Sequence, residues 1–98
     1  MAITNNIALL SNAVATGNPY KVIAGGLYAL SVVATWNGST AKLQILGPDG
    51  ATYQDIDAAL SFTANGIQGV DLPGGCTVKM VVSGGPPAAM YANLGLVR

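Results

Sequence analysis

Residues 27–46 decide the fold class, and they read LYALSVVATWNGSTAKLQIL. In the first half, every even-numbered position from Tyr28 to Trp36 is apolar or aromatic. In the second half, apolar residues alternate with Lys42 and Gln44. Side chains of a strand point alternately to its two faces, so an alternation of period two predicts strands with one buried face. The stretch therefore predicts two β-strands.

The dipeptide Asn37-Gly38 separates these two strands. Asparagine and glycine tolerate the positive φ angles of a type I′ turn, and this turn joins neighbouring antiparallel strands. We therefore predict that residues 27–36 and 40–46 pair with each other as a β-hairpin.

Turn signals recur along the whole chain about every 8–12 residues, which is the spacing of a β-sandwich or barrel. They are Gly17-Asn18-Pro19, Gly25-Gly26, Asn37-Gly38, Gly47-Pro48-Asp49-Gly50, Asn65-Gly66, Pro73-Gly74-Gly75 and Gly84-Gly85-Pro86-Pro87. The apolar alternation between them predicts further strands near residues 52–56, 60–64, 67–72, 76–83 and 90–97. The sequence thus predicts an all-β fold, a single antiparallel β-sandwich or jelly-roll-like domain of about seven or eight strands over residues 1–98.

The first eighteen residues fit a helix and a strand almost equally well. Thr4 and the asparagines after it could cap a short helix over residues 7–15. We favour an extended N-terminal arm or an edge strand over residues 1–18. The opening MAITNNIALL lacks the basic start and long apolar stretch of a signal peptide. No run reaches the roughly 18 apolar residues of a membrane span. We therefore expect synthesis in the cytoplasm and no membrane partner.

The surface carries unusually little charge. Only 8% of the residues are charged and the net charge is zero, whereas soluble domains typically carry about 25% charged residues. The exterior must therefore consist mostly of small, weakly polar and aliphatic side chains. Exposed apolar area usually marks contact sites, so we expect copies of the chain or a larger assembly to cover much of this surface. The alternative is a monomer of low charge.

The composition also excludes several chemistries. The chain has one cysteine and no histidine, so it forms no internal disulfide, no cysteine zinc site and no histidine-dependent catalytic group. The bases Lys21, Lys42, Lys79 and Arg98 are scattered and form no stripe for nucleic acid. We therefore predict no enzymatic activity, no catalytic residues, no cofactor and no metal.

Three aspartates form the one local acidic group. Asp49, Asp55 and Asp57 suggest either a calcium or paired-carboxylate site, or a polar strand end followed by a loop. We favour the strand end, because no Asp-x-Asp-x-Asp-Gly pattern supplies the six to eight oxygens that calcium takes. Cys76 opens an apolar strand face, and we expect it to be a small buried residue.

Five aromatic residues provide a second candidate site. Aromatic rings stack on the apolar faces of sugars, so a sugar-binding surface is one interpretation of these residues. Packing in the core or at an interface is the interpretation we favour. The residues are Tyr20, Tyr28, Trp36, Tyr53 and Tyr91.

Four segments together resemble small β-rich head decoration, or cement, proteins of tailed bacteriophages. They are residues 8–14 (ALLSNAV), 46–53 (LGPDGATY), 72–75 (LPGG) and the stretch from Val82-Ser83-Gly84-Gly85-Pro86 to Tyr91. The resemblance rests on rhythm and turn segments and covers most of the chain. It implies a structural virion protein, without catalytic residues, that binds the outside of a capsid, often as a trimer.

These observations together predict a capsid decoration protein located on the outer surface of the phage head. Its expected partners are the lattice of the major capsid protein and further copies of the chain, most often in a homotrimer. An N-terminal arm that pairs with a neighbour's edge strand is one route of attachment. The alternative function is a carbohydrate- or receptor-binding module of a phage fibre or tail. The expected assembly contacts are Ile3, Ile7, Leu10, Val81, Pro86, Pro87 and Tyr91.

Overall fold

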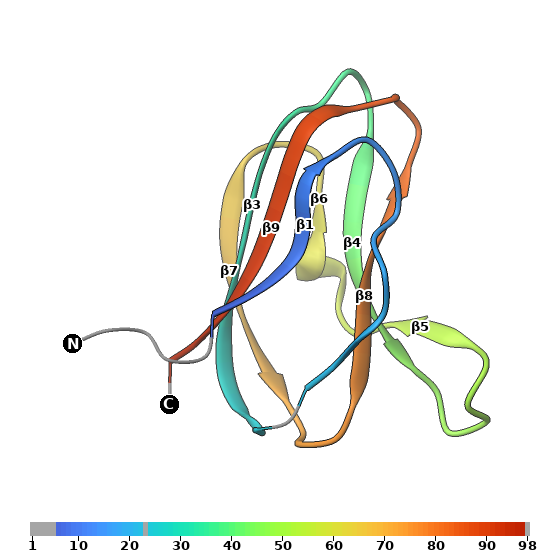
Figure 1. Cartoon of the computed structure of the whole chain (residues 1–98), viewed down its shortest axis with the longest axis vertical. Helices are drawn as coiled ribbons and strands as arrows, with labels where there is room; N and C mark the ends of the chain where they lie inside the picture. The colour runs from blue at the N-terminus through green and yellow to red at the C-terminus, as the bar shows by residue number, and fades with distance from the viewer. Residues whose placement is uncertain (1–5, 23, 98) are drawn as a thin grey trace.

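Two antiparallel β-sheets pack face to face (Figure 1) in a computed structural model that describes residues 6–22 and 24–97. This confirms the predicted all-β antiparallel sandwich. The described residues form nine strands, and the one without a predicted counterpart is β2, which is only two residues long. The elements are β1 (Asn6–Ala13), β2 (Tyr20–Lys21), β3 (Gly26–Thr35), β4 (Thr40–Leu46), β5 (Tyr53–Asp55), the 3-10 turn η1 (Ala58–Leu60), β6 (Ser61–Phe62), β7 (Gly66–Leu72), β8 (Thr77–Ser83) and β9 (Ala88–Leu96).

Sheet A contains four strands in the order β1-β9-β3-β7. Sheet B has the order β2-β8-β4-β5, and β6 pairs with β4 on the same side as β5. Every described strand pair is antiparallel. The longest ladders join β3 to both β7 and β9 and join β4 to β8. The interior strands are therefore β9 and β3 in sheet A and β8 and β4 in sheet B.

The core lies between the two sheets and follows the predicted alternation. Tyr28, Leu30 and Val32 of β3 are buried, and so are Ala41 and Leu43 of β4. The alternation in β8 and β9 is confirmed in the same way. Their buried side chains are Val78, Met80, Met90, Ala92 and Leu94.

The predicted β-hairpin at Asn37-Gly38 is wrong. The turn itself forms: Asn37 and Gly38 have φ angles of 49° and 79°, and the Ser39 N–H donates to the Trp36 carbonyl over 2.8 Å. However, β3 and β4 belong to different sheets. Both edges of β3 are already occupied by β7 and β9, so the turn carries the chain across the sandwich instead of back along β3.

Two other turn predictions have different outcomes. Residues 47–50 join β4 to β5 as a true hairpin, in which Leu46 lies opposite Tyr53, and Gly50 takes the positive φ of 73° that the turn requires. At Asn65-Gly66 the chain again changes sheets, because β6 pairs with β4 whereas β7 pairs with β3.

Strand β1 lies at an edge of sheet A, where it pairs with β9. Residues 6–13 are therefore an edge strand, and the alternative of a helix over residues 7–15 does not form. The pairing is irregular, with two register shifts and a positive φ of 49° at Asn12. The first five residues of the expected N-terminal arm lie outside the described residues.

Candidate functional site

The outer face of sheet A is built from the residues that alternate with the core. On β3, the outward residues are flanked on one side by β9 and on the other by β7. Ser31 lies between Asn93 and Ile67, and Val33 lies opposite Tyr91. The next row towards the other end of the sheet consists of Gly95, Ala29 and Gly69. Small side chains at its centre therefore keep this face flat.

Large apolar side chains surround this flat centre. Of the six large hydrophobic residues that are exposed in the described part of the chain, four point outwards from sheet A. Ile67 is 72% exposed, Val97 58%, Val33 44% and Tyr91 43%. The position of Val97 follows from its N–H, which donates to the Leu27 carbonyl over 2.7 Å and continues the β9 register. Apolar side chains that gather on one face, unlike single exposed ones, are typical of contact surfaces.

Charge is nearly absent from the outer face of sheet A. Among the described residues of its four strands, Asp71 on β7 is the one ionised side chain. It lies opposite Leu27, at one end of the β3–β7 ladder. This face therefore has little ordered hydration to lose when it packs against another protein surface.

The outer face of sheet B carries most of the described charge. Lys42 on β4 and Lys79 on β8 alternate with buried residues and therefore point outwards. Lys21 on β2 lies opposite Thr77 on β8 and points to the same face. The Lys79 ammonium lies 4.0 Å from the centre of the Tyr53 ring, a cation–π geometry. The face is therefore hydrated and basic.

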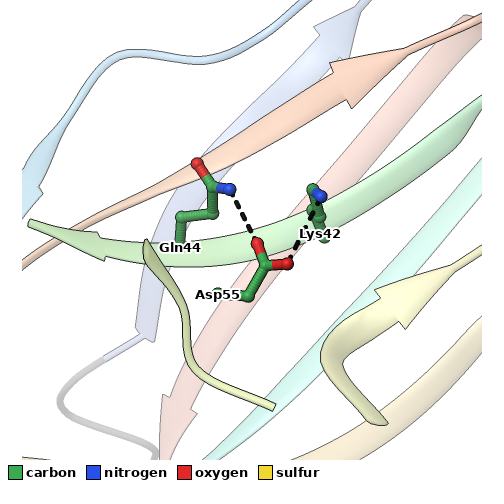
Figure 2. Close-up of polar contacts among 3 residues, drawn as sticks. All are labelled: Lys42, Gln44 and Asp55. Carbon is green, nitrogen blue, oxygen red and sulfur yellow. Dashed lines mark hydrogen bonds and ion pairs between the residues drawn. The ribbon is translucent and has the colours of Figure 1, made fainter. Parts of the chain in front are cut away.

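One carboxylate on this face is held by two neighbouring side chains (Figure 2). Gln44 Nε2 donates to Asp55 Oδ1 over 2.7 Å, and Lys42 Nζ lies 3.5 Å from Asp55 Oδ2. The amide hydrogen bond from Gln44, with a smaller contribution from the Lys42 charge, lowers the pKa of Asp55 below its usual range. Asp55 is thus engaged by its neighbours on β4.

The other two aspartates stabilise local backbone. Asp49 accepts hydrogen bonds from the N–H groups of Ala51 and Thr52, both over 2.9 Å, and from the Thr52 hydroxyl over 2.6 Å. These bonds, the hydroxyl first, lower the pKa of Asp49 to about 2. Asp57 caps η1 by accepting from the Ala59 N–H over 3.0 Å. In the described part of the chain, no three acidic, cysteine or histidine side chains gather where they could hold a metal ion.

A small hollow opens at the edge of the sandwich between η1 and β7. Ile56, Leu60 and Val70 supply its apolar lining, and Asp57 and Asp71 are also among the residues that line it. Its volume is about 250 Å³, below the roughly 300–1,000 Å³ of pockets that enclose small ligands.

The five aromatic residues do not gather on one surface. Tyr28 is buried, its hydroxyl donates to the Ala24 carbonyl, and burial raises its pKa. Trp36 packs against the core and donates from Nε1 to Asn65 Oδ1 over 2.9 Å. The Asn65 oxygen also accepts from the Ala34 N–H over 3.0 Å, so this contact fastens the β6–β7 connection to β3.

The remaining three tyrosines lie on different parts of the surface. Tyr20 is on the edge strand β2, Tyr53 is on sheet B beneath the Lys79 ammonium, and Tyr91 is on the outer face of sheet A. A cation already occupies one face of the Tyr53 ring. These positions provide no shared stacking platform for a sugar.

Several of the predicted contact residues are buried within this chain. Ile7 and Leu10 are only 9% and 3% exposed and belong to the core, and Pro87 is buried as well. Ile7 and Leu10 point from β1 into the core between the two sheets, so all three side chains are covered within the chain itself. Ile3 lies outside the described residues.

The other predicted contacts lie on separate surfaces. Tyr91 is exposed on sheet A, Val81 is half-buried on the outer face of sheet B opposite Lys42, and Pro86 is exposed in the loop before β9. Val33 and Ile67 are exposed on the outer face of sheet A but were not among the predicted contact residues. Each of the two residues alternates with the buried positions of its strand, and this pattern could have identified it as exposed.

The remaining features of the described chain indicate no further chemistry. Cys76 is half-buried and packs against the core, and burial raises the pKa of its thiol. No helix among residues 6–22 and 24–97 has the length and apolar character needed to cross a membrane. Comparisons with protein-family models, with curated proteins and with solved structures each find no match to this chain.

Proposed function

We propose that this protein is a structural subunit that attaches to a larger protein assembly through the outer face of sheet A. The observation that carries the proposal is the concentration of exposed Val33, Ile67, Tyr91 and Val97 on one flat and almost uncharged face. Burying apolar area stabilises a contact by about 25 cal/mol per Å². Such a face therefore favours contact with protein over exposure to water.

The distribution of charge supports the same orientation. The lysines and Asp55 lie on the outer face of sheet B, which keeps that side hydrated. With sheet A against the assembly, sheet B would face the solvent. An interface usually excludes charged residues from its centre and tolerates them at the rim, and Asp71 lies at such a rim position.

The assembly that we propose is a bacteriophage capsid, with this chain as a head decoration protein on its outer surface. Support comes from the resemblance of the turn segments to decoration proteins and from a surface suited to protein contacts. A repeated lattice offers many identical sites, so modest single contacts give lasting attachment when the bound subunits also contact each other. We also propose that bound copies contact each other, as in the trimer that the resemblance implies.

Cosedimentation with empty heads assembled from the major capsid protein of the same phage tests the proposal. Val33→Lys places a charge beside Tyr91 on the outer face of sheet A, and we expect it to weaken attachment about tenfold or more, since a buried unpaired charge is costly. Thr40→Lys adds the same charge to the outer face of sheet B and should leave attachment unchanged. Equal binding of the two variants, or no binding of the unmodified chain, would refute the proposal.

A further inference from the structure

The described edges of the two sheets differ in how well they are protected against pairing with another strand. Natural proteins shorten, bend or cover their edge strands to prevent such pairing. In sheet B, β2 has two residues on one edge, and β5 and β6 supply three and two residues on the other. In sheet A, β1 has two register shifts. The chain after β1 also crosses close to it, because a Cβ at Gly17 would lie 2.6 Å from the Leu9 carbonyl oxygen.

Strand β7 has none of these protections. Its seven residues, GIQGVDL, pair with β3 in an unbroken register from Gly66 to Leu72. The strand contains no lysine and no proline. It is therefore the one long and regular edge among the described strands.

The direction of the β7 backbone groups follows from the pairing of β3. The Leu27 carbonyl accepts from Val97 on the β9 side, and the peptide groups of successive residues in an antiparallel strand point to opposite sides. The odd-numbered residues of β3 therefore bond to β9 and the even-numbered ones to β7. In β7, it follows that Gln68 and Val70 bond to β3. The N–H and C=O groups of Ile67, Gly69 and Asp71 point to the free edge.

We infer that β7 pairs with β7 of a second copy, antiparallel about a two-fold axis at Gly69, and joins the two sheets A into one continuous sheet. In this register Gly69 bonds to Gly69 of the second copy, and Ile67 bonds to Asp71. Each carboxylate then lies opposite an aliphatic side chain. The two Asp71 residues are about 13 Å apart at 3.3 Å per residue, which is beyond the Debye length of about 8 Å at physiological salt.

The hollow beside β7 supports the same pairing. The Gln68 side chain is on the core-facing side of β7 yet is exposed, because none of the described strands covers this part of the sandwich edge. In the paired arrangement, Val70 of the second copy lies opposite Gln68, beside the apolar lining formed by Ile56 and Leu60. A second copy therefore covers the hollow, and its backbone uses the free groups of the edge.

This contact predicts a dimer, because a two-fold contact uses the same surface of both copies and closes on itself. The resemblance to decoration proteins instead predicts a trimer. The mass of the oligomer in solution therefore distinguishes the dimer from the trimer. The inference is also independent of the proposed attachment through the outer face of sheet A. Val33→Lys should leave the dimer intact.

Cysteine crosslinking tests the register. In a Cys76→Ser background, Gly69→Cys places two thiols across the axis, where the Cα atoms of a hydrogen-bonded pair are about 5.5 Å apart, within the roughly 4.4–6.8 Å that a disulfide spans. A Cβ at Gly69 meets no other atom closer than 3.8 Å, so the cysteine fits. Asp71→Cys in the same background is the matched control. We expect the Gly69→Cys variant to form covalent dimer about tenfold faster under mild oxidation, and equal rates would overturn the inference.

Sedimentation equilibrium of the unmodified chain tests the contact without a crosslink. The mass should rise with concentration from 9.8 kDa towards the dimer. Gly69→Pro removes an N–H that points to the free edge, where proline is tolerated, and should weaken the dimer about tenfold. Thermal unfolding of this variant checks that it folds. A chain that stays monomeric, or a trimer unaffected by Gly69→Pro, would overturn the inference and leave the edge to a different partner or to none.

Discussion

The two sheets contribute similarly to the core but differ on their outer faces. Leu30 in sheet A and Leu43 in sheet B are buried to the same degree, at 0% and 1% exposed. Outside, sheet A presents Val33, Ile67 and Tyr91 around a flat centre, whereas sheet B presents its lysines and Asp55. The inner faces of both sheets therefore form the core that stabilises the fold. The proposed function depends on the difference between the two outer faces.

The contrast also shows where the low charge of the chain matters. A composition with 8% charged residues could leave both faces equally poor in charge. Instead, the described lysines are concentrated on sheet B, and sheet A keeps Asp71 alone. One outer face of the sandwich is therefore charged, and the other is almost uncharged.

The largest effect is expected from shortening one central leucine in each sheet, which tests whether the two sheets contribute equally to the core. Leu30→Ala and Leu43→Ala both remove a fully buried side chain, so each should lower the free energy of unfolding by about 2–5 kcal/mol. Chemical denaturation measures both values. A large loss for one variant and a loss below about 1 kcal/mol for the other would show that the sheets do not share one core equally.

A matched pair of surface charges tests the unequal outer faces. Val97→Lys on sheet A and Thr40→Lys on sheet B change the net charge by the same amount, so general repulsion between molecules rises equally. Only the first removes an exposed apolar group from the contact face, and we expect it to raise the solubility in ammonium sulfate more than Thr40→Lys does. Equal solubility of the two variants would remove the distinction between the faces.

A smaller loss of stability is expected in acid, and it should arise at Asp49 in the turn between β4 and β5 of sheet B. The folded-state pKa of Asp49 is about 2, below the usual value of about 3.9. Its stabilising contribution is therefore complete above about pH 4 and is lost as the pH falls towards 2. Asp49→Asn should flatten this part of the curve of Tm against pH, and Thr52→Val, which removes the hydroxyl donor, should raise the pKa of Asp49. If Tm of Asp49→Asn falls in acid as steeply as Tm of the unmodified protein, Asp49 does not cause this loss of stability.

Local pattern was sufficient to predict most strands and their buried faces. The alternation from Tyr28 to Trp36 identified the inward side of β3, and the glycines of residues 47–50 identified the β4–β5 hairpin. Both features depend on residues that are close in sequence. Among the predicted contact residues, Tyr91 is exposed on the outer face of sheet A, whereas Ile7 and Leu10 are in the core.

The sequence by itself determined which side of each strand is apolar, because side-chain direction alternates with a fixed period of two. Only the tertiary structure decided which strands become neighbours. The turn at Asn37-Gly38 has the φ angles of a hairpin, yet β3 already has a partner on each side, and β4 must join the other sheet. That choice depends on contacts between residues far apart in the chain. It is also what gathers Val33, Ile67 and Tyr91 from three strands onto one face and leaves β7 as a free edge.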